Sequence, residues 1–175
     1  KIVINSFYGK GFGDNGKSIA NEILKRNLDI DLVWLLDKET KQEETIPTDI
    51  RVSYINSLNS YFEMATAKIW IENCRKNTNI LKRKKQFYIQ TWHGGLGLKK
   101  IEGDAINSLS ERYIDNAQKD SKKTDLYVSN SNYLTELYKK AFWYNGVILE
   151  SGCAKNDILF EDKEKYRNNL RQFYN

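Results

Sequence analysis

Histidine, proline, methionine and cysteine are scarce in this sequence of 175 residues, which has one histidine, one proline, one methionine and two cysteines. Two cysteines are too few for a disulfide scaffold, and Cys74 and Cys153 lack the spacing of a metal-binding or redox motif. This cysteine usage favours a reducing compartment such as the cytoplasm. Because no cluster of metal ligands is visible, we expect no metal site and no bound cofactor.

A long hydrophobic run is also missing. No apolar segment approaches the roughly 20 residues that a membrane-spanning helix needs, and the first residues do not resemble a signal peptide. Hydrophobic residues make up 40% and charged residues 29% of the sequence, which is the balance of one globular domain. Because the sequence begins with Lys1 rather than methionine, we expect it to be part of a longer protein.

Positive charge is in excess, with a net charge of +5. This excess indicates an anionic partner, which can be a nucleic acid, an acidic membrane surface or a phosphorylated substrate. The densest basic run, 82–85, is either a solvated loop or a contact with anionic lipid. Single-strand binders interleave aromatic and basic residues, and no segment here concentrates that pattern. A nucleic-acid-binding module is therefore the less favoured alternative, and no nucleic acid is expected as a partner.

Apolar segments typical of strands alternate with segments of helical periodicity. The strands are predicted at 1–7, 31–36, 51–55, 68–71, 86–92, 125–129 and 147–150, and the helices at 17–26, 57–66, 107–119 and 132–142. In the second helix, Leu58, Tyr61, Phe62 and Ala65 are spaced to form one buried face. The alternation predicts an α/β, Rossmann-like fold, with a mostly parallel sheet and helices on both faces.

Eight of the ten glycines fall in two short stretches, and each stretch follows a predicted strand. They are Gly9, Gly11, Gly13 and Gly16, and then Gly94, Gly95, Gly97 and Gly103. Open α/β sheets bind ligands beyond the carboxyl ends of their strands, and glycine lets a backbone approach a ligand closely. We therefore expect one cleft between the two stretches. Tight turns without a ligand are the alternative.

The first stretch also matches two short nucleotide-binding patterns. Residues 11–18 fit the P-loop pattern, and Gly11, Gly13 and Gly16 fit the dinucleotide fingerprint, with Asp37 21 residues after Gly16. In a P-loop the glycine pattern starts directly at the end of the strand, whereas here residues 8–10 intervene. A P-loop-type nucleotide-binding protein therefore stays an alternative interpretation.

The single histidine, His93, follows the predicted strand 86–92 and precedes Gly94 and Gly95. Its imidazole is thus expected at the carboxyl edge of the sheet, beside a conformationally free backbone. Histidine changes its charge near neutral pH, so it can accept a proton from a hydroxyl group. Lys99 and Lys100 follow closely and can neutralise phosphate oxygens. The alternative is a histidine that only hydrogen-bonds its own turn.

Several motifs resemble those of the CDP-glycerol glycerophosphotransferase family. Residues 90–101, Gln-Thr-Trp-His-Gly-Gly-Leu-Gly-Leu-Lys-Lys-Ile, resemble the family's Trp-His-Gly-Thr-Pro-Leu-Lys-Lys-Ile signature, and residues 5–15 resemble its opening Ser-Phe-x-Gly-Lys-x-Tyr-x-Asp-Asn-Pro. Weaker matches at 65–68, 129–132, 142–144 and 152–159 keep the same order. The resemblance covers nearly the whole chain, from residue 5 to residue 159.

The resemblance implies the N-terminal half of a transferase with two Rossmann domains, of the GT-B type. Residues 1–160 would be the acceptor-side domain, and 161–175 a connector helix toward a nucleotide-binding domain. The enzyme would transfer glycerol phosphate from CDP-glycerol, or another CDP-polyol, to a hydroxyl of a lipid-linked polymer such as a teichoic acid. The implied location is cytoplasmic, as a peripheral protein on the inner face of the cell membrane.

The resemblance also implies roles for single residues. His93 would be the catalytic base, and the expected substrate-binding residues are Gly11, Asp14, Asn15, Gly94, Gly95 and Lys99. Helix capping is the alternative role for Asp14 and Asn15, and a solvated position is the alternative for Lys99. Residues 95–97 replace the family's Thr-Pro and add one residue, so ribitol phosphate or another polyol phosphate, and a capsule rather than a wall polymer, stay open.

Overall fold

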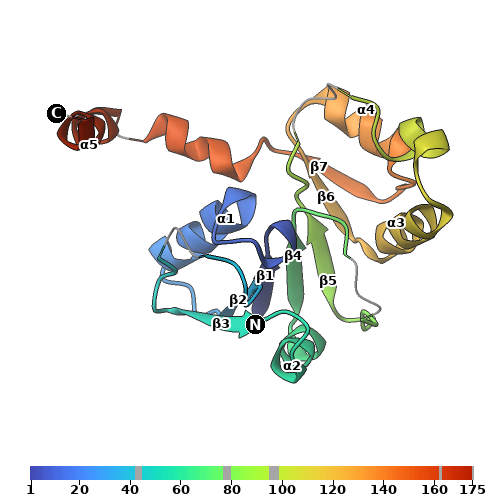
Figure 1. The fold of residues 1–175 in the computed structure, drawn as a ribbon, viewed down its shortest axis with the longest axis horizontal. Helices are drawn as coiled ribbons and strands as arrows, with labels where there is room; N and C mark the ends of the chain where they lie inside the picture. Colours follow the sequence, from blue (N-terminus) through green and yellow to red (C-terminus); the bar gives the residue numbers. More distant parts are fainter. Residues whose placement is uncertain (42–44, 77–79, 95–98, 162, 175) are drawn as a thin grey trace.

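Seven parallel strands form one sheet in the order β3-β2-β1-β4-β5-β6-β7 (Figure 1). The computed structural model describes residues 1–41, 45–76, 80–94, 99–161 and 163–174. The strands are β1 Ile2–Asn5, β2 Leu32–Leu36, β3 Ile50–Tyr54, β4 Ile69–Glu72, β5 Phe87–Gln90, β6 Leu126–Ser129 and β7 Val147–Glu150. The strand order reverses between β1 and β4, which is where open α/β sheets form a ligand-binding crevice.

Helices cover both faces of the sheet, as the alternating pattern predicted. The α-helices in the described residues are α1 Asp14–Lys25, α2 Leu58–Thr66, α3 Glu111–Lys123, α4 Asn132–Ala141 and α5 Lys163–Tyr174, and the short 3₁₀ helices are η1 Phe7–Gly9, η2 Glu102–Ser108 and η3 Ala154–Phe160. Helix α1 lies on one face, and α2 lies on the other. The Rossmann-like fold class is therefore confirmed. None of the described helices is long and apolar enough to span a membrane.

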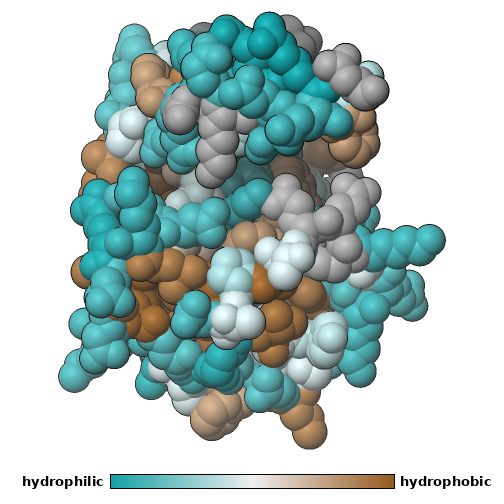
Figure 2. Space-filling view, turned by 90° about the vertical axis from the view of Figure 1, so that its left-hand side faces the viewer, coloured by the Kyte–Doolittle hydropathy of each residue, from teal (hydrophilic) through white to brown (hydrophobic). Residues whose placement is uncertain are grey.

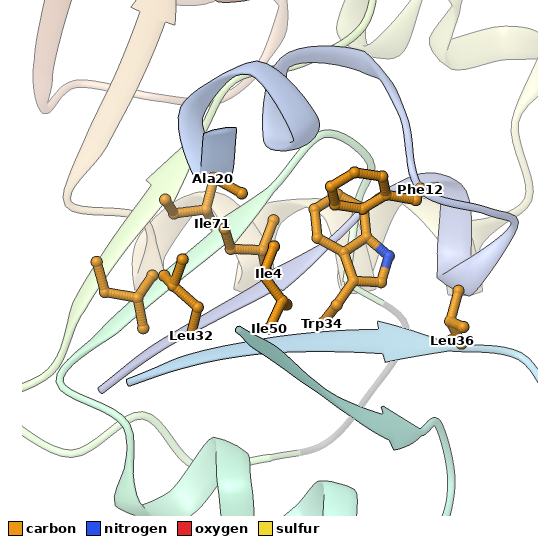
Figure 3. Close-up of a cluster of buried hydrophobic side chains, with 9 residues drawn as sticks. Ile4, Phe12, Ala20, Leu32, Trp34, Leu36, Ile50 and Ile71 are labelled. Carbon is orange, nitrogen blue, oxygen red and sulfur yellow. The ribbon is translucent and has the colours of Figure 1, made fainter. Parts of the chain in front are cut away.

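One core cluster joins α1 to the first strands. Ala20 of α1 packs with Ile4 and Trp34, which are fully buried on β1 and β2 (Figure 3). Gly16 lets α1 approach this closely, because a Cβ atom there would lie 2.8 Å from Ile4 Cγ2. This is the packing role of the last glycine in a dinucleotide fingerprint. On the opposite face, Met64 of α2 packs with Val3.

The buried face of α2 is not the one predicted from the apolar spacing. Leu58 and Phe62 are 89% and 61% exposed, and Tyr61 and Ala65 are exposed as well. The buried residues of α2 are instead Ser60, Glu63 and Met64. Burial of Glu63 is possible because Arg51 Nη1 and Lys1 Nζ each lie 2.6 Å from its carboxylate oxygens. The buried face of α2 thus contains a paired carboxylate, whereas the prediction placed aromatic rings on that face.

The opposite, apolar side of α2 adds to a surface with many exposed hydrophobic residues. On the neighbouring edge strand β3, Val52 and Tyr54 are also exposed. Figure 2, which looks onto the side of the molecule that carries β3, shows hydrophobic residues gathered on this side.

The ion pairs of Glu63 make the free energy of unfolding depend on pH in the acid range. The hydrogen bonds from Arg51 and Lys1 hold the pKa of the Glu63 carboxyl below its usual range. A carboxyl with a lowered folded-state pKa stabilises the fold above its unfolded pKa of about 4.3, and the contribution disappears as the pH falls through the folded value. We expect Glu63→Gln to lower the free energy of unfolding by about 1–3 kcal/mol at pH 7. Urea unfolding should show that the difference from wild type shrinks below pH 4; a constant difference would contradict this origin.

The helix predicted at 107–119 is displaced toward the C-terminus. Ser110 caps α3, since its hydroxyl oxygen accepts a hydrogen bond from Tyr113 N at 3.2 Å. Residues 107 and 108 belong instead to η2. A serine at the N-cap position, whose hydroxyl accepts a hydrogen bond from the amide three residues later, is a signal for the start of a helix. The prediction relied on the apolar pattern alone and therefore placed the helix start too early. Similarly, α1 begins at Asp14 rather than at 17.

Candidate active site

His93 lies where β5 ends, on the surface of a cleft. The strand stops at Gln90, and Trp92 adopts a left-handed backbone conformation with φ 53. Two hydrogen bonds hold this turn: Trp92 N donates to Gln90 Oε1 at 2.9 Å, and Trp92 O accepts from Asn15 Nδ2 at 3.1 Å. The strand ends at this turn, and His93, the residue that follows Trp92, is exposed. The site is thus at the predicted carboxyl edge.

One nitrogen of the imidazole is occupied and the other is not. Nδ1 of His93 lies 2.7 Å from the backbone carbonyl oxygen of Asn73. Because a carbonyl oxygen can only accept, Nδ1 must carry the proton at this distance. Nε2 then has a lone pair, and it makes no hydrogen bond to any residue in the described ranges. This is the tautomer that a general base requires.

A closed ring of contacts holds this arrangement. The Asn73 amide donates to Asp14 Oδ2 at 2.6 Å, and Lys155 Nζ pairs with Asp14 Oδ1 at 2.7 Å. Lys155 Nζ also donates to His93 O at 3.0 Å. The Asp14 side chain is only 5% exposed, so this pairing is shielded from solvent. The ring therefore links the ends of β4 and β5 to the start of α1 and to the segment after β7.

Aromatic rings and a thiol surround the imidazole. Trp92 stacks on it with centroids 4.6 Å apart, and the Phe7 ring lies at 5.4 Å. Cys74 Sγ lies 3.6 Å from His93 Nδ1. Burial, followed by the nearby Glu72, raises the pKa of the Cys74 thiol to about 12. Cys74 is therefore a protonated packing group and not a nucleophile at neutral pH.

The cleft beside His93 has a volume of about 880 Å³, which is large enough for a nucleotide-sized ligand. Gly94, Lys99 and Lys100 line it together with His93. Both lysines are exposed. Glu102 also lines the cleft, but Arg75 neutralises its buried carboxylate at 2.9 Å. The free charge facing a ligand is thus positive.

The predicted site residues divide into two groups. His93, Gly94 and Lys99 line the cleft. Asp14 and Asn15 brace the His93 turn from behind, so the structure favours a role in holding the loop over helix capping. Asn15 is buried and joins two segments: its amide nitrogen donates to Trp92 O, and its Oδ1 accepts from Lys155 N at 3.1 Å.

The two remaining predicted site residues, Gly11 and Gly95, belong to neither group. Gly11 lies away from the cleft, with φ 97, and its carbonyl oxygen accepts a hydrogen bond from Trp34 Nε1 at 3.1 Å. Gly95 lies outside the described residues.

Residues 11–13 form a short connection packed against the domain, and residues 14–18 already belong to α1. Helix η1 separates β1 from this stretch. Ser6 Oγ donates to Gly13 O at 3.0 Å, and Gly16 packs against Ile4. The glycine pattern therefore does not start directly at the end of β1, and its last glycine serves helix packing. This arrangement gives no support to the P-loop alternative.

Sequence reasoning missed Asn73, Lys155 and Arg75 as parts of the site. Asn73 directly follows β4, so its position after a predicted strand was an available signal. Lys155 comes from a segment 62 residues beyond His93, and its contact with the His93 carbonyl depends on the folded arrangement. Lys155 falls in the weaker family match at 152–159, which was an available signal, whereas nothing in the local sequence of Arg75 indicates a role beside the histidine.

A seven-stranded parallel sheet with a histidine at its carboxyl edge and a cationic cleft defines a Rossmann-like domain with a candidate ligand site. The sequence matches the family of CDP-Glycerol:Poly(glycerophosphate) glycerophosphotransferases over residues 1–175. The chain therefore belongs to this family.

Similar curated proteins include the teichoic acid poly(glycerol phosphate) polymerase of Bacillus spizizenii, which is 34% identical over 168 residues, covering 90% of this chain and 41% of that protein. The teichoic acid glycerol-phosphate transferase of Staphylococcus aureus is 34% identical over 166 residues, with the same two shares. The chain thus spans less than half the length of these relatives.

Solved structures of the wall teichoic acid polymerase TagF are similar in fold. One superposes with a TM-score of 0.89 at 28% sequence identity, covering 100% of this chain and 44% of that chain. A histidine variant of TagF soaked with CDPG gives a TM-score of 0.87 at 27% identity, covering 99% of this chain and 45% of that one.

Proposed function

We propose that this chain is the acceptor-activating half of an enzyme that transfers glycerol phosphate, or a related polyol phosphate, from a CDP-activated donor to a hydroxyl of a lipid-linked polymer. The observation that carries the proposal is the hydrogen bond between His93 Nδ1 and Asn73 O, which leaves Nε2 with a lone pair at the cleft. Membership of the glycerophosphotransferase family supports the choice of donor.

In the proposed reaction the acceptor hydroxyl oxygen attacks the phosphorus that carries glycerol. Nε2 of His93 takes the hydroxyl proton, a new phosphorus–oxygen bond forms, and the bond to the leaving CMP breaks. The positive charge that develops on the imidazole is stabilised because Nδ1–H points at the Asn73 carbonyl oxygen. Transfers of this kind depend mainly on positioning and electrostatic stabilisation.

Lys99 and Lys100 would meet the negative charge of the donor phosphates. Both are exposed residues of the cleft, and neither is paired with a carboxylate in the described part of the chain. The proposal also includes the domain organisation: residues 1–160 bind the acceptor, and 161–175 lead to a nucleotide-binding domain that holds most of the donor. Helix α5, at the end of the chain away from the sheet, is compatible with such a connector (Figure 1).

The direct test is release of CMP by the protein in the full length that its gene encodes. It should release CMP from CDP-glycerol when a lipid-linked acceptor is present, and CDP-ribitol should be tested in parallel. Release that depends on both substrates supports the proposal. ATP or GTP hydrolysis that is lost in Lys17→Ala, without CMP release, would favour the P-loop alternative instead.

A contact with the inner face of the cell membrane is the second part of the proposal, and the basic run 82–85 supports it. Lys82 Nζ pairs with Asp125 at 2.9 Å, and an Arg83 nitrogen donates to Ala67 O at 3.4 Å. Lys84 and Lys85 are exposed and make no ion pair in the described ranges. Half of the run is therefore structural, and the other half is available for anionic lipid.

We expect Lys84→Gln with Lys85→Gln to weaken binding to vesicles containing anionic lipid by about 2 kcal/mol, roughly 30-fold, since each lysine near such a surface contributes about 1 kcal/mol. Lys139→Gln with Lys140→Gln removes the same charge from α4 and serves as the control. Vesicle co-sedimentation at two salt concentrations measures both. Equal losses in the two variants would show that only net charge matters and would remove the assignment to the 82–85 run.

A further inference from the structure

A second cavity, of about 210 Å³, lies beyond the carboxyl ends of β1, β2 and β4. Asn5 and Glu72, the last residues of β1 and β4, form part of its wall. The cavity therefore sits at the point where the strand order reverses, which is the favoured ligand position in open α/β sheets. The cleft beside His93 is separate from it.

The two cavities are neighbours. Tyr8 lines both of them. Glu72 lines the second cavity, and the next residue, Asn73, carries the carbonyl group that holds His93. A ligand that occupied both cavities would pass the Tyr8 ring, with its reacting end beside the imidazole.

The charges around the second cavity disfavour a phosphate group. Two cationic residues line it, Arg75 and Lys76. Lys76 Nζ forms an ion pair with Glu72, and both side chains are nearly buried. Arg75 is bound to Glu102 at 2.9 Å and to Asp120 at 3.3 Å. Each cation thus already has a carboxylate partner, and Glu72 itself would repel an anion.

The other polar groups of the cavity suit hydroxyl groups. Asn5 Oδ1 is buried and accepts no hydrogen bond from the described residues. The Ser60 hydroxyl donates to Ser57 O at 2.8 Å, so its oxygen can accept a further hydrogen bond. Burial, followed by Cys74, raises the pKa of the Tyr8 phenol to about 12, so this group stays protonated. Its hydroxyl is hydrogen-bonded to Cys74, so Tyr8 contributes mainly its ring to the wall.

Apolar side chains complete the cavity. Leu35, Ile55 and Met64 line it, together with the ring of Tyr61. Amide and hydroxyl groups set against aliphatic and aromatic carbon match a polyol or a sugar, whose hydroxyls point outward from an apolar carbon skeleton. The volume is smaller than that of a site for a complete drug-sized ligand, about 300–1,000 Å³, and suits a single unit of a polymer.

We propose that this cavity is a subsite for one neutral, hydroxyl-rich unit of the acceptor, a glycerol or sugar residue adjacent to the one whose hydroxyl reacts at His93. This assignment rests on the proposed transferase function, and it separates the recognition of the acceptor from the binding of the donor phosphates. The phosphates lie with Lys99 and Lys100, and the neutral unit lies with Asn5, Asn56 and Ser60, which all line the second cavity.

Nuclear magnetic resonance titration of the 175-residue chain tests the subsite directly. The probes are glycerophosphoglycerol, methyl glucoside and inorganic phosphate. We expect glycerophosphoglycerol or methyl glucoside to shift the amide signals of Asn56, Ser60 and Tyr61 in a saturable way, whereas inorganic phosphate leaves them in place. Saturable shifts of these signals by phosphate alone, or no shift with any probe, would overturn the proposal.

Asn56 offers a variant with a matched control. Its backbone has φ 61, a conformation that glycine adopts without strain, so Asn56→Gly removes the amide and leaves the turn in place. We expect the variant to bind the probe at least five-fold more weakly. Asn27→Gly makes the same change at φ 50 on an exposed turn after α1 and should bind as wild type. Equal affinities for the two variants would count against the subsite.

A second pair of variants tests the aromatic wall. Tyr61→Ala, at a residue 42% exposed on α2, should also weaken binding at least five-fold, and Tyr133→Ala, 57% exposed on α4, should not. The subsite and the transferase function can thus fail separately, because the titration needs no donor, whereas CMP release does.

Discussion

Replacing His93 with alanine should lower the rate of CMP release by about 10²–10⁴-fold while the domain keeps its fold, because this is the usual contribution of a general base. The side chain is exposed, and its hydrogen bond is to the Asn73 carbonyl, which lies at the edge of the sheet. Loss of the ring therefore removes little packing. Single-turnover CMP release from CDP-glycerol, with a lipid-linked acceptor and the full-length protein, measures the chemical step.

A second substitution separates the proton-accepting role from the stacking role. His93→Phe keeps an aromatic ring beside Trp92 and Phe7 but has no nitrogen to accept a proton. We expect it to lose as much activity as His93→Ala, with a melting temperature close to that of wild type. Near-normal turnover in either variant would remove the assignment of His93 as the base. Partial activity in the phenylalanine variant alone would indicate that ring stacking positions the substrate.

The position of His93 could be predicted because it depends on local sequence. An apolar run, 86–92, followed by glycines predicts a strand that ends at a turn, and β5 with its carboxyl-edge histidine follows that pattern. The strand predicted at 147–150 is β7 with the same bounds. Alternation of strands and helices also sufficed for a parallel sheet, because crossover connections between parallel strands need intervening segments of this length.

The hydrogen bond that fixes the tautomer of His93 could not be predicted from the sequence. It joins His93 to Asn73, which is 20 residues away, and Asn73 is itself held by Asp14, 59 residues away. Such contacts depend on which strands are neighbours in the sheet. The order β1-β4-β5 brings these three chain segments together, and the strand order cannot be determined from the periodicity of one sequence.

The error on α2 has the same origin. Apolar spacing predicts a buried face well when the polar residues of a helix face water. Glu63 can be buried because two cations neutralise it: Lys1, which directly precedes β1, and Arg51 of β3. The partners lie 62 and 12 positions away along the chain, so the compensation becomes visible only in the folded sheet.

The buried guanidinium of Arg75 is a stability determinant that the sequence did not reveal. It is 3% exposed and bonds to groups from four other parts of the chain: Glu102, Asp120 with Ser121, Tyr127 and the Phe142 carbonyl oxygen. The Phe142 ring lies over it with the guanidinium carbon 5.1 Å from the centroid. Arg75 therefore ties the end of β4 to η2, α3, β6 and the end of α4.

Arg75→Ala should lower the free energy of unfolding by about 3–5 kcal/mol, because it leaves the buried carboxylates of Glu102 and Asp120 without a counter-charge. Lys119→Ala breaks an ion pair whose side chains are 63% and 58% exposed, and it should change stability by no more than about 0.5 kcal/mol. Urea unfolding of both variants at pH 7 gives the comparison.

A third variant identifies the origin of the loss. Combining Arg75→Met with Glu102→Gln and Asp120→Asn removes all three charges together, and we expect it to recover a large part of the stability that Arg75→Ala loses. A loss below about 1 kcal/mol in Arg75→Ala would contradict a buried, charged network. No recovery in the triple variant would show instead that the hydrogen bonds to Ser121, Tyr127 and Phe142 matter more than the charges.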